Sequence, residues 1–393
     1  MNLKVEQLGR FSAIDIQLLV RNGAIETPCL VIDAHEIDRM LGLFRTYLPF
    51  VRLQYSVKAN NAPEVIRHLH SRGVGFDVAS AAEAELTTEY GVPPERLILS
   101  NAIHPRSTLE DIFTRGIPLV TVDNEGALRA IAAEASQRGK TPPAVLIRIR
   151  VPSMNSQLDL NTKFGCSCEQ AVRLFDIARD LGVQANGVHF HVGTQCWDVE
   201  TYRLAVGQAK EVLAATRVND HTGRVLNIGG GMPDPRMAEK AGGLETFFVG
   251  LAKVLAPIHE QGFELIAEPG RVLVSSACTA VCTVVGRATR DGLPWLYLDD
   301  GIYGMFSAIY FERRDFRFET LAPSSRQSAS YMIAGPTCDS IDTLGTFTLA
   351  GDPQPGSILI APDAGAYSVS VKCHFNGFAH INTYLVNSSF CHE

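Results

Sequence analysis

An alternation of short β-branched runs with helix-like stretches is the feature that most limits the folds open to this sequence. Eight runs follow one another, and between them lie segments whose apolar residues recur at helical spacing, as in Ala62–Arg72 and Glu169–Leu181. The eight runs are Val51–Val57, Gly75–Ala79, Arg96–Ser100, Pro118–Val122, Val145–Ile149, Gly187–His191, Val225–Ile228 and Glu264–Ala267. Eight strand–helix units predict a (β/α)8 TIM barrel. A doubly wound parallel sheet is the alternative, although no GxGxxG sequence opens the first unit.

The pattern changes after Glu268, where strand-like runs continue but helical spacing becomes scarce. Glycine and proline separate these runs, which predicts a β-rich domain of the sandwich or barrel type. The expected strands are Leu273–Val285, Trp295–Leu298, Ser330–Ala334, Ser357–Ala361 and Asn382–Val386. We expect the barrel to span residues 29–268. Residues 269–393 are expected to form the β-rich domain, to which residues 1–28 add a strand.

Composition excludes several classes of protein. The chain has 35 basic and 42 acidic residues, a net charge of −7, so no basic face for nucleic acid is expected. Apolar residues make up 46%, which is typical of a well-packed globular protein rather than a disordered one. No run of 18 apolar residues predicts a membrane span, and the first ten residues lack an apolar signal core. We therefore expect a cytoplasmic protein with neither nucleic-acid nor membrane partners.

The nine cysteines show no CxxC pair and no spacing typical of zinc ligands. They predict neither a structural zinc site nor a disulfide framework, and most are expected to be buried thiols.

Chemically active residues fall where the barrel strands end. In such barrels the active site lies at the C-terminal ends of the strands. The residues at or near these ends are Lys58, Asp77, Asn101, Arg148, His191, Gly229–Gly231 and Glu268–Arg271. Three consecutive glycines let backbone N–H groups approach a phosphate closely, although they also suit a flexible turn. Glu268 suits either an ion pair with Arg271 or Arg148, or a carboxylate that holds a cationic ring nitrogen.

Lys58 lies between Val57 and Ala59, and this apolar setting is compatible with a lysine that forms Schiff bases. Such a lysine requires partial desolvation to lower its pKa.

These residues belong to a set of motifs that resembles the fold-type III pyridoxal-phosphate decarboxylases, the ornithine/diaminopimelate decarboxylase family. The resemblance extends from about Thr27 to Val386 and rests on the order and spacing of short motifs. The motifs are Tyr55–Asn60, Gly75–Ser80, Phe190–Gly193, Gly229–Gly231, Glu268–Arg271, Asp300–Gly304, Gly335–Asp339, Gly365–Tyr367 and Phe375–Phe378. The resemblance implies an alanine-racemase-like barrel that binds pyridoxal 5'-phosphate and a β-rich C-terminal domain.

The resemblance also implies roles for individual residues. Lys58 would form the Schiff base with the cofactor aldehyde, His191 would stack on the pyridine ring, and Glu268 would keep the ring nitrogen protonated. The other residues expected to bind or support the cofactor are Asp77, Arg148, Thr194, Gly230, Gly231, Gly270, Arg271 and Tyr367. Thr194 stands where the family usually has serine.

The substrate residues implied by the resemblance lie in the β-rich domain. Cys338 would return a proton to the α-carbon as a general acid. The alternative is a buried structural cysteine, which is the default interpretation for a cysteine taken at random. Asp300 and Asp339 would hold the distal amine, although Asp300-Gly301 is also a turn signal, and Tyr297 would contact the substrate. The family pairs subunits head to tail, so a homodimer is expected in which Cys338 and Asp339 enter the neighbour's site.

The implied activity is that of a carboxy-lyase in polyamine synthesis, most simply one converting L-ornithine to putrescine, with L-lysine to cadaverine as a near neighbour. Diaminopimelate enzymes usually carry Cys-Glu-Ser where this chain has Cys338-Asp339-Ser340, and Met232 stands where phenylalanine is common. Diaminopimelate or a decorated diamino acid remains an alternative substrate. A non-catalytic regulator of the same fold is a second alternative. An amino-acid racemase is a third, but it would need a tyrosine base in place of Cys338-Asp339.

Overall fold

The computed structural model describes residues 13–216, 224–378 and 380–387. Contacts between Cα atoms divide the chain into two compact units. One unit comprises Gly42–Lys58 and Ile66–Val272, and it contains the barrel. The other comprises Met1–Leu41, Ala59–Val65 and Leu273–Glu393, and it contains the remaining strands.

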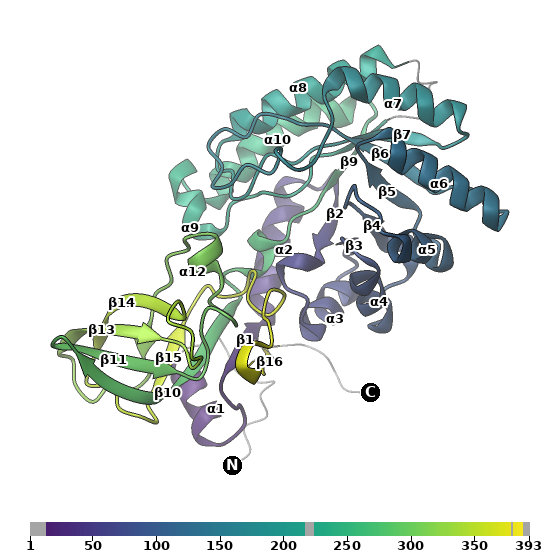
Figure 1. The fold of residues 1–393 in the computed structure, drawn as a ribbon. Helices are drawn as coiled ribbons and strands as arrows, with labels where there is room; N and C mark the ends of the chain where they lie inside the picture. The colour runs from purple at the N-terminus through teal and green to yellow at the C-terminus, as the bar shows by residue number, and fades with distance from the viewer. Residues whose placement is uncertain (1–12, 217–223, 379, 388–393) are drawn as a thin grey trace. The chain divides into compact units, whose positions relative to one another are not determined.

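The barrel is closed by eight parallel strands in sequence order, and each strand pairs with the next while the last pairs with the first (Figure 1). The strands are β2 (Val51–Ser56), β3 (Gly75–Val78), β4 (Leu97–Leu99), β5 (Leu119–Val122), β6 (Ala144–Arg148), β7 (Ala185–His189), β8 (Val225–Asn227) and β9 (Glu264–Ala267). These short strands carry buried apolar side chains on both faces. They are therefore stable only where both faces are covered. The predicted (β/α)8 barrel is confirmed.

Helices lie between successive barrel strands along the chain, with one more before the first strand and one after the last, and Figure 1 shows helices around the outside of the barrel. They are α2 (Ala34–Tyr47), α3 (Pro63–Ser71), α4 (Ala81–Glu89), α5 (Arg106–Arg115), α6 (Glu125–Arg138), α7 (Cys168–Asp180), α8 (Val199–Ala215), α9 (Pro235–Ala238), α10 (Leu244–Glu260) and α11 (Arg271–Val274). Short 3-10 turns are η2 (Val57–Ala59), η3 (Pro94–Arg96) and η4 (Glu239–Ala241). The predicted helices at Ala62–Arg72 and Glu169–Leu181 are present as α3 and α7. A capping box between Ser167 and Gln170 begins α7.

The β-rich unit is built on the long strand β10, which has a bulge between Val284 and Gly286. The N-terminal half of β10 pairs with β1 and β15, and its C-terminal half pairs with β11. The elements of this unit are α1 (Ala13–Arg21), β1 (Cys29–Asp33), β10 (Cys278–Arg290), β11 (Leu293–Leu298), α12 (Ala308–Phe311), β12 (Glu319–Thr320), β13 (Ser328–Ala334), β14 (Thr343–Ala350), β15 (Ile358–Ala361), η5 (Phe375–Gly377) and β16 (Asn382–Val386). The prediction that this part of the chain is rich in β-strands is therefore confirmed.

Three sequence expectations differ from the structure here. The strand expected within residues 1–28 is β1, which begins at Cys29 and joins β10 and β16, so Cys29–Leu41 group with the β-rich unit instead of the barrel. Residues 13–21 form the helix α1, and residues 1–12 lie outside the described residues. The strand expected from Leu273 starts at Cys278, because α11 occupies the preceding turn. Strands β12 and β14 were not expected.

Within the described ranges, no single helix is long and apolar enough to cross a membrane. The segments Pro235–Ala241 and Leu244–Glu260 satisfy length and composition only as a pair bent by 66°.

Candidate active site

Lys58 and Asp77 meet where β2 and β3 end. Lys58 lies in η2, directly after β2, and its Nζ is 3.4 Å from Oδ2 of the buried Asp77. Ser56 also donates its hydroxyl to Asp77 Oδ2 at 2.5 Å. Burial raises the pKa of Asp77, the nearby charge of Glu268 raises it further, and Lys58 and Ser56 oppose the shift. The side chain of Lys58 is 45% exposed, so its amine is accessible from outside the barrel.

Glu268 follows β9 and is surrounded by hydrogen-bond donors. Its Oε1 accepts from Ser100 Oγ and from Asn227 Nδ2, both at 2.5 Å, and its Oε2 lies 3.3 Å from His189 Nε2. Burial opposes ionisation of Glu268, but His189, Lys58 and Ser100 outweigh it and hold the pKa well below its ordinary value. The site therefore contains a buried carboxylate that stays ionised and suits a cationic partner.

His191 lies just beyond β7 and is held by a backbone contact. Its Nδ1 accepts the N–H of Gly193 at 3.1 Å. Burial lowers the pKa of His191 well below its ordinary value, and the positive charges of Arg148 and Lys58 lower it further. The ring is therefore a neutral imidazole, which suits stacking on an aromatic ring.

The triple glycine connects β8 to the rest of the site. The N–H of Gly229 donates to Asn227 Oδ1 at 2.9 Å, and the carbonyl of Gly229 accepts the N–H of Glu268 at 2.8 Å. In the described part of the chain, the N–H groups of Gly230 and Gly231 donate to no protein acceptor. A Cβ at Gly230 would lie 2.6 Å from the Glu268 carbonyl oxygen, so only glycine fits at this position without a shift of the backbone.

The remaining barrel residues named from the sequence lie at the same strand ends. Arg148 is buried at the end of β6, with its guanidinium 5.1 Å from the Phe164 ring centre. Thr194 is held by backbone hydrogen bonds with Leu158 and Gln157. Gly270 and Arg271 are buried in the turn that begins α11.

In the β-rich unit, Cys338 and Asp339 lie in an exposed loop between β13 and β14. Cys338 is exposed, and its N–H donates to Asn376 Oδ1 at 3.1 Å. Asp339 accepts the Tyr303 hydroxyl through Oδ2 and the Ile341 N–H through Oδ1. The bond from Tyr303 lowers the pKa of Asp339, so this carboxylate is an anion at neutral pH.

Asp300, Tyr297 and Tyr367 each make contacts within the same unit. Asp300 is only 3% exposed, and its Oδ2 accepts the Met305 N–H at 2.8 Å. Tyr297 lies in β11, where its hydroxyl accepts from Arg290 at 3.1 and 3.2 Å. Tyr367 donates its N–H to the carbonyl of Ala59, the residue after Lys58, at 2.7 Å.

Four residues of the barrel cluster were missed by the sequence analysis: Ser56, Ser100, Asn227 and His189. Each lies at or directly after the end of a barrel strand, which is the signal that could have identified them. His189 precedes His191 by two residues, the spacing that places two strand side chains on one face.

Comparison with known proteins identifies the family. The family model described as the pyridoxal-binding domain of pyridoxal-dependent decarboxylases matches residues 34–275. The chain belongs to the pyridoxal-dependent decarboxylase family. The resemblance inferred from the motifs is thereby confirmed, and the cofactor of this decarboxylase-family protein is pyridoxal phosphate.

The relatives of this family member include enzymes and a regulator. Over 383 residues it is 32% identical to a lysine/ornithine decarboxylase of Selenomonas ruminantium, covering 94% of this chain and 91% of that protein. A crystal structure of Vibrio vulnificus lysine/ornithine decarboxylase with cadaverine is 28% identical, with a TM-score of 0.84, covering 96% of this chain and 100% of that one. Antizyme inhibitor 2 of Xenopus laevis is 29% identical over 368 residues, 88% of this chain and 78% of that protein.

The barrel-end residues fit pyridoxal phosphate. The ionised Glu268 matches a protonated ring nitrogen, and the N–H groups of Gly230 and Gly231 match phosphate oxygens. Lys58 would supply the amine that the cofactor aldehyde requires.

Proposed function

We propose that the protein is a carboxy-lyase that decarboxylates a basic L-amino acid, with L-ornithine as the first substrate and L-lysine as its near neighbour. The observation that carries the proposal is the cluster at the barrel strand ends. There, an ionised Glu268, an accessible Lys58 and the triple-glycine backbone lie together. The relatives from Selenomonas ruminantium and Vibrio vulnificus support it, because both are lysine/ornithine decarboxylases.

In this proposal the barrel residues bind and orient the cofactor. Bound pyridoxal phosphate supplies an electron-accepting ring for the pair of electrons that decarboxylation leaves. Lys58 would hold the cofactor covalently, Glu268 would accept the ring N–H, and the neutral His191 would pack against the ring. The residues proposed to bind the phosphate are Gly230, Gly231, Gly270, Thr194, Arg271 and Tyr367, and those proposed to support the site are Asp77 and Arg148.

The β-rich unit supplies the substrate residues. Cys338 Sγ gives the proton that replaces the lost carboxylate, and its exposed loop keeps the thiol accessible. Asp339 binds the distal ammonium of the substrate, because Tyr303 keeps this carboxylate ionised. Contact of Asp300 and Tyr297 with the substrate would require them to exchange their bonds with Met305 and Arg290.

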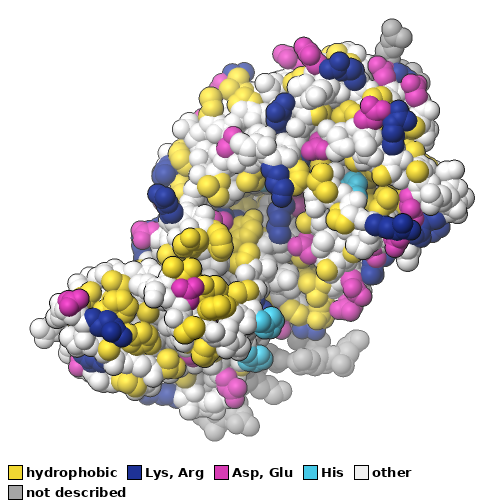
Figure 2. All heavy atoms as spheres, viewed as in Figure 1, with side chains coloured by type: hydrophobic (Ala, Val, Ile, Leu, Met, Phe, Trp, Pro, Cys, Tyr) yellow, Lys and Arg dark blue, Asp and Glu magenta, His cyan; other side chains and the backbone are white. Residues whose placement is uncertain are grey.

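The proposed assembly is a head-to-tail homodimer in which Cys338 and Asp339 enter the partner subunit's barrel site. Large apolar side chains are exposed near this loop, including Ile341 (51%) and Phe378 (46%). Helix α12 exposes Tyr310 and Phe311, and Figure 2 shows hydrophobic side chains gathered over that part of the β-rich unit. Exposed apolar clusters of this kind are typical of subunit interfaces.

A regulator without catalytic activity is the second candidate, favoured by the similarity to antizyme inhibitor 2. The enzyme is favoured because Lys58, the glycine loop and Cys338 are all present. A decarboxylase for diaminopimelate or a decorated diamino acid remains the alternative within the enzyme class.

A substrate panel tests the proposal directly. The purified protein is incubated with pyridoxal phosphate and with ornithine, lysine, arginine, diaminobutyrate or meso-diaminopimelate, and carbon dioxide release is measured. We expect release from ornithine or lysine. A preference for diaminopimelate would contradict the role of Asp339 as an amine binder, and no release from any member would favour the regulator.

Two variants test the assigned roles. Borohydride should attach the cofactor to Lys58, so a Lys58→Ala protein that still retains it covalently would contradict the assignment. Cys338→Ala should slow turnover or misplace the proton, and unchanged kinetics would remove this thiol from the reaction.

A further inference from the structure

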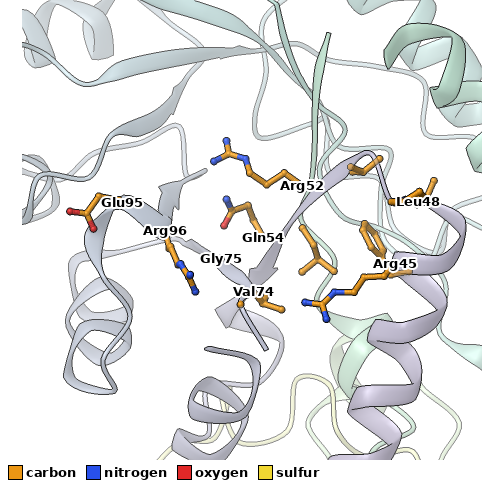
Figure 3. A pocket seen from close by; sticks show the side chains of 13 residues that line it. Arg45, Leu48, Arg52, Gln54, Val74, Gly75, Glu95 and Arg96 are labelled. Carbon is orange, nitrogen blue, oxygen red and sulfur yellow. The ribbon is translucent and has the colours of Figure 1, made fainter. Parts of the chain in front are cut away.

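A cavity of about 360 Å³ lies at the opposite end of the barrel from Lys58 and Glu268. Its walls come from the starts of β2 and β3, the segment before β2, the last turn of α2, and η3 before β4 (Figure 3). The start of a strand and its end lie on opposite faces of a parallel barrel, so this cavity is separate from the candidate active site. Its volume is in the range of sites that hold small metabolites.

The walls of the cavity carry three arginines from three different elements. Arg45 comes from α2, Arg52 from β2 and Arg96 from η3, while Glu95 is the only acidic residue among those that line it. Arg45 uses one N–H for the Arg72 carbonyl at 2.5 Å, and Arg52 pairs with Glu264 at 3.0 Å. A guanidinium has five N–H donors, so each of these arginines retains donors for a ligand. The chain as a whole has a charge of −7, which makes this basic cavity a local exception.

Gln54 provides a second, independent observation. Its side chain is 2% exposed, and its buried Oε1 has no hydrogen-bond partner among the described residues. A Cβ at Gly75 would lie 2.0 Å from this oxygen, so the glycine leaves room for the amide. Figure 3 shows Gln54 between Arg52 and Arg96 in this view of the cavity. A buried amide oxygen without a partner is costly, and a small shift of the amide would let a bound ligand satisfy it.

We propose that this cavity is a binding site for a small phosphorylated metabolite. The doubly charged phosphate would contact the guanidinium groups of Arg45, Arg52 and Arg96, and the amide of Gln54 would hydrogen-bond an adjacent polar group. Guanidinium groups recognise phosphate through paired N–H donors, and arginines from three elements around the cavity can supply them. The apolar side chains of Phe44, Leu48 and Val74 form the wall for the rest of the molecule.

Calorimetric titration of the pyridoxal-phosphate-loaded protein with inorganic pyrophosphate, at constant ionic strength, tests the proposal. We expect saturable binding with one site per subunit. Arg52→Ala and Arg96→Glu should each weaken it by roughly tenfold or more, because each removes charge-assisted hydrogen bonds. Arg129→Ala is the matched control, since this exposed arginine on α6 pairs with Glu125, one turn away on the same helix, at 2.6 Å. It should bind pyrophosphate as the unaltered protein does.

Two further measurements distinguish binding in this cavity from loss of folding and from binding at the cofactor's phosphate site. The unfolding midpoint of each variant without pyrophosphate should match that of the parent, because Arg52 and Arg96 are exposed. The absorbance of the bound cofactor should stay constant through the titration. Release of cofactor by pyrophosphate would place binding at the cofactor's own phosphate site and overturn the proposal. Absence of saturable binding, or equal binding by Arg96→Glu and the parent, would also overturn it.

Discussion

Two buried carboxylates at the barrel strand ends have opposite pKa shifts, although their side chains have similar burial. Glu268 accepts from Ser100 and Asn227 and lies beside His189, so its anion is stabilised. Asp77 accepts from Ser56 and lies 3.4 Å from Lys58, but burial and the charge of Glu268 outweigh both and raise its pKa. The number of donors around each group decides which one can hold a cation. This makes Glu268 the better match for the protonated ring nitrogen of pyridoxal phosphate.

His189 is expected to act as a positioning residue through Glu268. Replacing it with leucine removes a group that lowers the pKa of Glu268, so the acid limb of the kcat profile should move to higher pH. The kcat at neutral pH should fall roughly tenfold, as expected from losing a buried polar contact, 3.3 Å long, with a charged group. His189→Gln retains an N–H donor and should recover most of the rate. Equal profiles for both variants and the parent would contradict this role.

Asp300 should make stability depend on pH. Burial raises its pKa to about 7 from an unfolded value near 4, so the folded state binds the extra proton between these values. Its contribution to stability is therefore present at low pH and is lost as the pH rises through 7. Asp300→Asn should remove this dependence. Between pH 5 and pH 8, the parent should lose on the order of 2 kcal/mol of unfolding free energy that the variant does not lose. Urea unfolding at the two pH values measures it, and parallel behaviour of both proteins would contradict it.

At the scale of elements, the loop after β8 links two strands of the barrel. The Gly229 carbonyl accepts the Glu268 N–H, and its own N–H donates to Asn227, so β8, the glycines and the end of β9 form one hydrogen-bonded unit. Tyr202 on α8 also donates its hydroxyl to the Gly230 carbonyl at 3.3 Å. The loop is therefore held in place, even though glycine allows wide backbone freedom. A fixed loop presents its N–H groups to a phosphate without further ordering.

Gly230→Ala should weaken cofactor retention. The new Cβ would lie 2.6 Å from the Glu268 carbonyl, which is a rigid backbone atom, so the loop must move. We expect the dissociation constant for pyridoxal phosphate to rise roughly tenfold or more, since the phosphate loses well-placed donors. Gly207→Ala on α8 is the control, because its Cβ meets nothing within 4 Å. Equal cofactor affinity of the two variants, measured by fluorescence titration, would contradict the proposed role of this loop in binding the phosphate.

At the scale of the whole molecule, the proposed chemistry is divided between the two units. The barrel carries the residues proposed to hold the cofactor, and the β-rich unit carries the proposed proton donor and substrate carboxylates. Such a division allows the substrate residues to act in a partner subunit, as the proposed homodimer requires.

Mixing two inactive variants tests this arrangement. Lys58→Ala and Cys338→Ala subunits are each expected to have little activity alone. In a head-to-tail dimer, one site of each mixed dimer receives both intact residues, so random mixing should restore about a quarter of the parent activity. Formation of the amine product after subunit exchange measures it. If Cys338 serves the barrel of its own chain, the mixture should stay inactive.

Much of the architecture was predictable from the sequence, because a buried parallel strand is encoded by a short β-branched run. Such a run can be recognised without knowing which strand it pairs with. The closed barrel, the change to a β-rich unit after Glu268, and the placement of Lys58, His191 and the triple glycine at strand ends all followed from this pattern. Strand β14 was missed, because polar and small residues such as Thr346 and Gly345 interrupt its apolar alternation.

The sequence by itself determined which residue types stand at the ends of the strands and, through their order, which family they belong to. Only the tertiary structure decided how those residues are charged and held. Ser56, Ser100, Asn227 and His189 are separated in sequence from the carboxylates they contact, and burial depends on elements from across the barrel. Electrostatic free energy depends on distance and solvent exclusion, and neither is written in a local pattern. For the same reason, the arginines that line the second cavity became a site only when α2, β2 and η3 were brought together.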